Sequence, residues 1–234
     1  MGDAYDASGK LYVSNCVSGT CAQAQGPNVV DVNEYDRSGN LIFSYSHGLV
    51  LPFGVAVDAA GNVYVADGGL GRPSRVLEYR QQQKRPIATC FTGLSNTGVA
   101  VDAGGDVFVS GDSSERGGGY LREHKRGLAG CKPYVPRITL GFAGGLRVDR
   151  QNRLVACDQN VGVDVISPPY KTVGSTIALT ANSRDAAINN ANTLVFIVDA
   201  ISAAVVVGTY PDGKYVTTLN GSGLSQPLGA ATYP

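Results

Sequence analysis

PFGVAVDAAGNVYVAD, residues 52–67, predicts two short β-strands joined by a tight turn. The apolar run from Val55 to Val57 is typical of a strand that is buried on both faces. In the second strand, strict alternation places Val63 and Val65 on one face of the sheet and Tyr64 on the other. Asp58 can accept backbone N–H groups two residues on, and Gly61 can take the positive φ that tight turns require, so the stretch predicts a hairpin.

The same pattern recurs along the chain. Further copies are GDAYDASGKLYVSN from Gly2, GVAVDAGGDVFVSGD from Gly98, GLRVDRQNRLVACD from Gly145 and DAAINNANTLVFIVD from Asp185, and a lone first strand, GAATYP, begins at Gly229. The residues that end the first strands are Asp6, Asp58, Asp102, Asp149, Asn189 and Tyr233, at spacings of 52, 44, 47, 40 and 44 residues. This period suits one four-stranded propeller blade per repeat, with Leu41–Tyr45 and Arg75–Tyr79 among the outer strands.

The repeats resemble the NHL repeat, whose typical copy reads P-x-G-v-a-v-D-x-x-G-n-v-y-V-a-D. Residues 52–67 match that pattern closely, and the copies from Gly2 and Thr97 match it well, while those from Gly144 and Arg184 are degenerate. The resemblance implies one all-β domain over residues 1–234, with repeats that start near residues 2, 54, 98, 145 and 185.

The number of blades departs from the usual NHL pattern, because such propellers usually have six. We expect five blades of four antiparallel strands, with an incomplete six-bladed NHL propeller as the alternative. Residues 229–233 form a surplus inner strand in either case. In the compact five-bladed closure that surplus strand is poorly ordered or packed on a seam.

The composition excludes several classes of protein. Nineteen basic and 19 acidic residues give a net charge of zero, so no global field attracts nucleic acid or a membrane surface. No apolar run approaches the about 20 residues of a membrane span. Residues 72–153 nevertheless hold 14 of the 19 basic residues. A polyanion such as nucleic acid could bind this patch through Arg80, Lys84, Arg85, Lys125 and Arg126, although solvated outer hairpins explain the same residues.

The cysteines favour an oxidising compartment. Cys16 and Cys21 lie in one Ser/Gly-rich loop, and Cys90 and Cys131 fall in neighbouring repeats, so both pairs are candidate disulfides, with Cys157 left as a buried thiol. Five reduced thiols are the alternative. An extracellular or periplasmic location is expected, although no secretory segment follows Met1 in the chain as written, and a lost leader would reconcile the two observations.

The candidate ligand site lies on one rim of the ring, where the second strands end. Side chains expected there are Asn15, Asp67, Asp112, Asp158 and Asp199, with Arg72 on an adjoining loop. If they converge, Asp67, Asp112 and Asp158 could bind a divalent cation such as calcium. The simpler interpretation is that each side chain caps the backbone of its own loop.

Two functions remain open. The first is a non-enzymatic, monomeric binding scaffold without a cofactor, which recognises a protein, glycan or small ligand through the rim loops. The second is a metal-dependent lyase or lactonase, as related propellers suggest, with its site at the channel mouth. His47 follows the outer strand Leu41–Tyr45, His124 ends another outer strand, and no nucleophile motif is present, so no catalytic residue is assigned and the binding scaffold is favoured.

Overall fold

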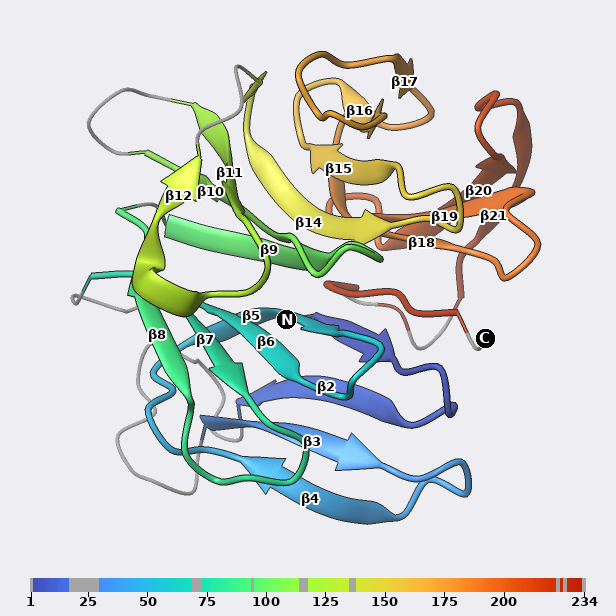
Figure 1. The fold of residues 1–234 in the computed structure, drawn as a ribbon. Helices are drawn as coiled ribbons and strands as arrows, with labels where there is room; N and C mark the ends of the chain where they lie inside the picture. Colours follow the sequence, from blue (N-terminus) through green and yellow to red (C-terminus); the bar gives the residue numbers. More distant parts are fainter. Residues whose placement is uncertain are drawn as a thin grey trace.

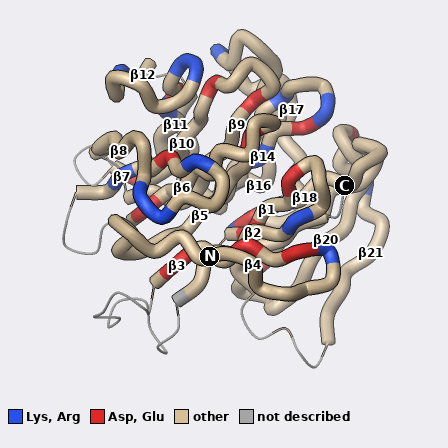
Figure 2. The backbone as a smooth tube through the Cα atoms, turned by 60° about the horizontal axis from the view of Figure 1, so that its bottom comes forward, with Lys and Arg blue, Asp and Glu red and all other residues tan. Residues whose placement is uncertain are grey.

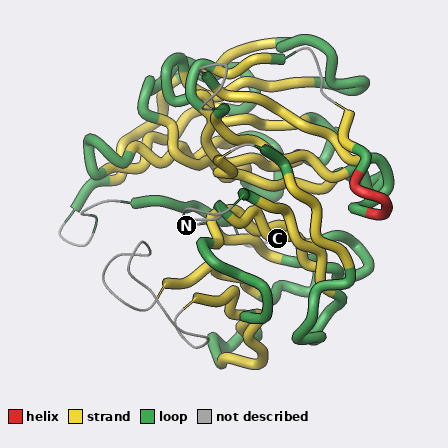
Figure 3. The backbone as a smooth tube through the Cα atoms, turned by 90° about the vertical axis from the view of Figure 1, so that its left-hand side faces the viewer, coloured by secondary structure: helices red, strands yellow, loops and turns green. Residues whose placement is uncertain are grey.

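The computed structural model describes residues 2–16, 30–68, 73–93, 95–113, 118–134, 138–221, 224 and 227–232, with Cys16 described by its backbone alone. Within these residues the chain forms five antiparallel sheets arranged as a five-bladed β-propeller (Figure 1). One turn of 3₁₀ helix, Ala129–Cys131, lies at the edge of the strand-rich body (Figure 3). None of the described segments is a helix with the length and hydropathy of a membrane span.

Each blade is one antiparallel sheet, and the strands follow the order of the chain from the centre outwards. Blade 1 contains β1 (Asp3–Tyr5), β2 (Leu11–Cys16), β3 (Val30–Tyr35) and β4 (Leu41–Tyr45), and blade 2 contains β5 (Pro52–Val57), β6 (Val63–Asp67), β7 (Arg75–Tyr79) and β8 (Ala88–Phe91). Blade 3 contains β9 (Ser95–Val101), β10 (Val107–Asp112) and β11 (Gly119–His124), and both β12 (Pro133–Tyr134) and β13 (Thr139–Leu140) pair with β11. Blade 4 contains β14 (Ala143–Val148), β15 (Leu154–Asp158), β16 (Gly162–Ile166) and β17 (Ser175–Ile177), and blade 5 contains β18 (Ser183–Ile188), β19 (Leu194–Asp199), β20 (Ala204–Thr209) and β21 (Tyr215–Leu219).

The first strands of the blades surround a central channel. β9 packs against both β5 and β14, β14 packs against β18, and β1 packs against β5. The end of the ring that carries the turns between first and second strands is called the turn side here. The opposite end, where the first strands begin and the second strands end, is called the loop side. The prediction of five four-stranded blades is confirmed.

The turns on the turn side form as the repeat predicts. Oδ1 of Asp58 accepts the backbone N–H groups of Ala60 and Asn62 at 2.9 and 2.8 Å, and the turn-opening residues Asp6, Asp36, Asp102 and Asp149 make the same pair of bonds in their turns. The fourth turn residue, such as Gly61 with φ of 82°, takes a positive φ. Asn152 and Asn192 hold this position in the two degenerate copies, with φ of 62° and 55°. Asparagine tolerates this region better than other residues with a side chain, so these copies keep the turn without glycine.

Glycine at the start of the repeat allows neighbouring first strands to approach closely. A Cβ added to Gly54 would lie 2.8 Å from the backbone N of Val99 and 2.9 Å from the Cα of Gly98. A Cβ on Gly2 would lie 2.8 Å from the backbone O of Phe53. The repeat therefore needs glycine here because a side chain would push adjacent blades apart at the channel.

Four apolar clusters fill the spaces between successive blades. Between blades 2 and 3, Tyr64 and Ala66 pack against Val107 and Val109, and the cluster includes Leu128 from an outer turn. Corresponding clusters lie between blades 1 and 2, 3 and 4, and 4 and 5. The two faces of β6, β10 and β15 therefore belong to two different interfaces, as their alternating sequences predict.

Residues 229–232 do not form the predicted surplus strand. The segment 227–232, called the strap here, lies between β18 and blade 1, where Figure 1 shows it in red. Each of its hydrogen bonds joins a backbone group to a side chain. The backbone N–H of Ala230 donates to the Asp185 carboxylate, and its backbone O accepts a bond from Arg147. The hydroxyl of Thr232 donates to the backbone O of Ile188. Without a backbone ladder the strap is not a β-strand. The expectation that this segment packs on a seam of the ring is confirmed.

The disulfide predicted between neighbouring repeats is present. Cys90 on β8 of blade 2 is bonded to Cys131 in the helical turn of blade 3, with Cα atoms 5.2 Å apart. Cys157 on β15 is a buried free thiol, as expected. Cys21 and the side chain of Cys16 lie outside the described residues.

Candidate ligand site in the central channel

Three charged side chains meet in the channel at positions where the other repeats have small or apolar residues. Arg147 on β14 occupies the position of Ala4, Ala56, Ala100 and Ala187 in the other first strands. Asp185 on β18 replaces the glycine that opens the other repeats, and Asp3 on β1 replaces an apolar residue. All three residues differ from the repeat pattern and lie at one location, which indicates that a requirement other than folding selects them.

The guanidinium of Arg147 connects three parts of the ring. It donates to Oδ2 of Asp185 at 2.6 Å, to the backbone O of Asp3 at 3.0 Å and to the backbone O of Ala230 in the strap at 3.1 Å. A weaker contact of 3.4 Å reaches the Asp3 carboxylate. A single side chain thus holds blades 4, 5 and 1 and the strap together.

Burial and charge act against each other in this cluster. Burial raises the pKa of Asp185 to about 6, although the positive charge of Arg147 lowers it. Burial also raises the pKa of Asp3. Burial opposes the charged form of Arg147, but Asp185 and Asp3 together hold its pKa above the ordinary value. The other oxygen of Asp185, Oδ1, is buried and has no hydrogen-bond partner among the described residues.

A cavity of about 380 Å³ opens on the loop side of this cluster. Its polar lining includes Asp112, Gln159, Arg184 and Asp185, with Arg147 at the inner end, and its apolar lining includes Phe53, Phe142 and Leu228. Asp112 accepts the N–H of Ala143 at 3.0 Å, and burial raises its pKa. Arg184 is exposed and forms no ion pair with any described carboxylate, so it is an available cation at the mouth.

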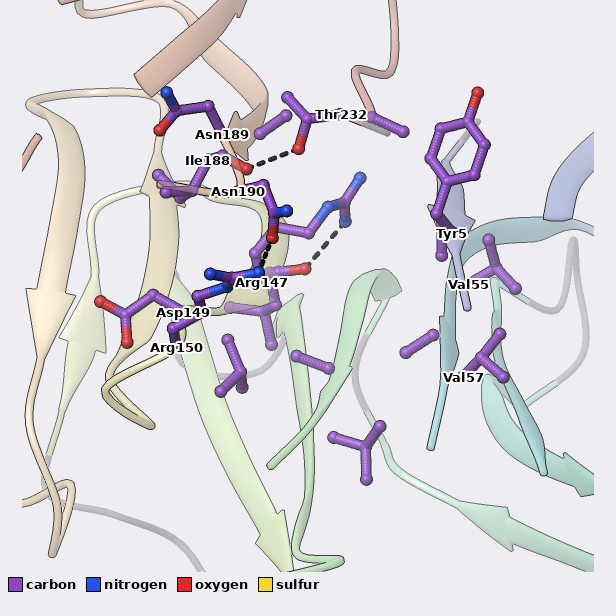
Figure 4. Close-up of a pocket in the computed structure, with 18 of the residues that line it drawn as sticks. Tyr5, Val55, Val57, Arg147, Asp149, Arg150, Ile188, Asn189, Asn190 and Thr232 are labelled. Carbon is purple, nitrogen blue, oxygen red and sulfur yellow. Dashed lines mark hydrogen bonds between the residues drawn. The ribbon is translucent and has the colours of Figure 1, made fainter. Parts of the chain in front are cut away.

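A second cavity, of about 250 Å³, opens on the turn side (Figure 4). Its wall contains the last apolar residue of each first strand, which are Tyr5, Val57, Val101, Val148 and Ile188. In Figure 4, Tyr5 faces the cavity from one side, and Arg150, Asn189 and Asn190 face it from the other. Arg150 donates to the side-chain oxygen of Asn190, so both polar groups are already paired. Arg147 lines both cavities and separates them.

Of the five side chains predicted at the loop-side rim, Asp112 lines the cavity there. Asp67 accepts N–H groups of Val50 and Leu51 and pairs with Arg75.

The other three predicted rim side chains are also engaged locally. Asp158 accepts the N–H groups of Phe142 and Asn160 at 3.2 and 2.9 Å, and Asn15 donates to Asp31 at 3.2 Å. Although burial opposes it, hydrogen bonds from Ser202 and Thr180 hold the pKa of Asp199 below its ordinary value. The simpler interpretation, that each side chain caps its own loop, describes Asp199 and one bond of Asp158, whereas Asp67 binds the backbone that precedes the first strand of its blade.

The predicted cation site would need several metal-binding side chains close together. Among the described residues, no three His, Cys, Asp or Glu side chains come together to hold a metal ion. Arg72, the remaining rim candidate, lies outside the described residues.

The basic residues of blades 2 and 3 lie on outer turns. Arg80, Lys84, Arg85, Lys125 and Arg126 are exposed, and Lys125 is paired with Asp106 at 2.7 Å and with Glu123 at 2.5 Å. Figure 2 shows Lys and Arg segments beside Asp and Glu segments over much of the molecule. This arrangement resembles a mixed, solvated surface more than a continuous basic face.

Sequence reasoning missed Arg147, Asp185 and Arg184. The signal was available for the first two, because aligning the repeats shows a charge at positions that are otherwise alanine and glycine. Arg184 has no such signal, since the residue before the repeat glycine varies between copies.

Comparison of the chain with protein-family models gives no match, and comparison with curated proteins gives none.

Proposed function

We propose that this protein is a non-enzymatic binding scaffold that takes a small ligand with a carboxylate or phosphate group at the loop-side mouth of its channel. The observation that carries the proposal is the exposed Arg184, which forms no ion pair with the described carboxylates, beside a cavity of about 380 Å³. Ligand pockets of this size typically combine apolar walls with a few polar groups that orient the ligand. Phe53 and Phe142 supply such walls here, and Asp112 and Gln159 supply hydrogen-bonding groups.

Arg184 is the residue that would select an anion. Guanidinium groups bind carboxylates and phosphates with two parallel hydrogen bonds, which gives both affinity and orientation. Arg147 contributes positive potential at the inner end of the cavity, but its hydrogen bonds are committed to Asp185, Asp3 and Ala230. Among the described residues, the ligand therefore meets Arg184 as an available cation at the mouth and Arg147 as a fixed cation behind it.

The setting we propose is an NHL-type propeller that works as a monomer outside the cytoplasm. Five copies of the NHL-like pattern support the family assignment. The Cys90–Cys131 disulfide supports an extracellular or periplasmic location, because such bonds persist mainly in oxidising compartments.

A screen of thermal stability tests the function. We expect ligands from a panel of carboxylates and phosphate esters to raise the unfolding midpoint, while neutral saccharides of similar size leave it unchanged. For the best ligand, Arg184→Ala should weaken binding by about 10- to 100-fold, as loss of a charged hydrogen bond worth about 1.5–3 kcal/mol implies. Isothermal titration calorimetry measures this change.

Arg80→Ala is the matched control, because Arg80 is also exposed but lies on an outer turn away from the channel. Its binding should equal that of the unmodified protein. Equal losses in both variants would contradict the proposal, and so would conversion of the ligand into a product.

A further inference from the structure

Two polar side chains in the wall of the loop-side cavity are anchored on one residue. Oδ1 of Asp112, at the end of β10, accepts the backbone N–H of Ala143 at 3.0 Å. The side-chain amide of Gln159, just after β15, donates to the backbone O of the same alanine at 2.8 Å. A further bond of 2.8 Å joins the backbone N–H of Gln159 to the backbone O of Phe142. Because both side chains bind Ala143, they lie close together in blades 3 and 4.

Each of these side chains keeps one acceptor oxygen for a ligand. Asp112 uses Oδ1 for its bond to Ala143, and among the described residues no donor reaches Oδ2. Gln159 uses its amide nitrogen, and no described donor reaches Oε1. Both side chains are half-buried and line the cavity. Acceptors that are partly removed from water cost free energy until a donor binds them, so a ligand with N–H groups is favoured here.

The cavity mouth also carries separate charges of opposite sign. Arg184 and Asp112 both line the cavity, but they do not form an ion pair with each other. Burial raises the pKa of Asp112, although the N–H of Ala143 and the positive charge of Arg184 both favour its ionised form. A ligand with a negative group alone would bring a like charge towards Asp112, which is unfavourable. The arrangement favours a ligand that carries both signs of charge.

Asp185 lines the same cavity but is not available to a ligand. Its Oδ2 binds Arg147 at 2.6 Å and the N–H of Ala230 at 3.3 Å. Its Oδ1 is buried in the space that a side chain on Gly145 would fill. Asp112 is therefore the carboxylate of this lining that a ligand can reach.

We propose that the ligand of the loop-side cavity is a free amino acid with an apolar side chain. Its ammonium group donates to Oδ2 of Asp112 and Oε1 of Gln159, and its carboxylate binds Arg184. An ammonium group has three N–H donors and a positive charge, so it satisfies both oxygens and balances the charge of Asp112. The apolar side chain packs on Phe53 and Phe142. This inference rests on the proposed function, because it names the ligand class of the same site.

Matched ligands test the inference on the unmodified protein. Calorimetry with a panel of free amino acids identifies the tightest ligand, which is then compared with its deaminated acid and its decarboxylated amine. For phenylalanine these analogues are 3-phenylpropionate and phenethylamine. We expect the amino acid to bind about 10- to 100-fold more tightly than either analogue, as one additional charged hydrogen bond implies.

Asp112→Asn tests the residue that binds the ammonium group. The variant keeps an oxygen for the N–H of Ala143 but loses the negative charge. It should lower the affinity for the amino acid to nearly that of the deaminated acid, and it should not weaken binding of the deaminated acid. Asp212→Asn is the matched control, because Asp212 is exposed in the turn after β20 and lies outside the cavity lining. It should change neither affinity.

The possible failures can be told apart. Equal affinities for the amino acid and its deaminated acid would overturn this inference and leave the proposed function standing. Equal losses for both ligands in Asp112→Asn would also overturn it, because Asp112 would then have only a structural role. The proposed function itself fails if no carboxylate or phosphate ester binds, or if Arg184→Ala binds these ligands as tightly as the unmodified protein does.

Discussion

At the scale of single residues, the molecule contains buried ionisable side chains whose charged forms burial destabilises. Arg147, Asp185 and Asp3 are charged in a channel where the other repeats place alanine, glycine and valine, and one arginine neutralises two carboxylates. His124 on β11 is almost fully buried, and neither of its ring nitrogens has a hydrogen-bond partner among the described residues. These two places should dominate the response of stability to mutation and to pH.

Arg147→Ala should destabilise the protein by about 3–5 kcal/mol, because it leaves the buried Asp185 without its counter-charge. Asp185→Gly combined with Arg147→Ala restores the residues of the other repeats, and it should recover most of the loss. Urea unfolding measures both variants. A double variant no more stable than the single one would show that the charges do not act as a pair.

His124 should make the protein less stable in weak acid. Burial, followed by the nearby charge of Arg122, lowers the pKa of His124. As pH falls below about 6.5, His124 binds a proton in the unfolded chain but not in the folded protein. The free energy of unfolding therefore falls by up to about 1.4 kcal/mol per pH unit. Below the folded-state pKa this loss levels off.

Unfolding in urea at pH 7.5 and 5.5 checks this expectation. His124→Leu should remove that part of the pH dependence, whereas His47→Leu, at an exposed position, should keep it. A parental slope that persists in the His124 variant would count against the assignment.

At the scale of elements, two kinds of contact join blades that are otherwise separate sheets. Glycine at the start of the first four repeats lets the first strands approach closely, as the backbone contacts at Gly2, Gly54 and Gly98 show. The Cys90–Cys131 bond fastens the outer edge of blade 2 to blade 3 across 41 residues of sequence. One device acts at the channel and the other at the periphery.

Gly54→Ala should cost about 1–3 kcal/mol, because the new Cβ would lie within 3 Å of the backbone of Val99 and Gly98. Gly221→Ala is the control, since nothing lies within 4 Å of its Cβ position. Equal unfolding midpoints for the two variants would argue against a tight contact between blades 2 and 3.

Removal of the disulfide should lower stability by about 2–4 kcal/mol, as expected for a loop of this length. The variant is Cys90→Ser together with Cys131→Ser, compared with the parent by urea unfolding under non-reducing conditions. Peptide mapping without reductant should show residues 90 and 131 in one cross-linked species. Separate peptides from the parent protein would contradict the pairing.

At the scale of the whole molecule, the ring is asymmetric. Four seams carry buried apolar clusters and hydrogen bonds from an outer turn to the preceding blade, while the fifth is spanned by the strap and by the bonds of Arg147. Among the described residues, closure at the fifth seam therefore depends on a few polar contacts, and we expect unfolding to begin there.

Deletion of residues 227–234 should destabilise the protein by at least about 1–3 kcal/mol, because Arg147 and Asp185 each lose a partly buried hydrogen bond. Hydrogen exchange should accelerate first in β1 and β18. Uniform acceleration over all five blades would contradict a weak fifth seam.

The repeat pattern was enough to predict the four-stranded blades and their tight turns, and it offered Cys90 and Cys131 as a candidate pair, because these depend on residues close along the chain or on one repeated spacing. The folded ring was needed to show that Arg147 meets Asp3, 144 residues away, that Asp67 and Asp158 bind loop backbone, and that Cys90 and Cys131 are bonded. It also decided how the fifth seam closes. The repeat is nearly the same in every blade, so its pattern cannot distinguish the one seam where the two ends of the chain meet. That difference arises from which side chains the completed ring brings across the channel.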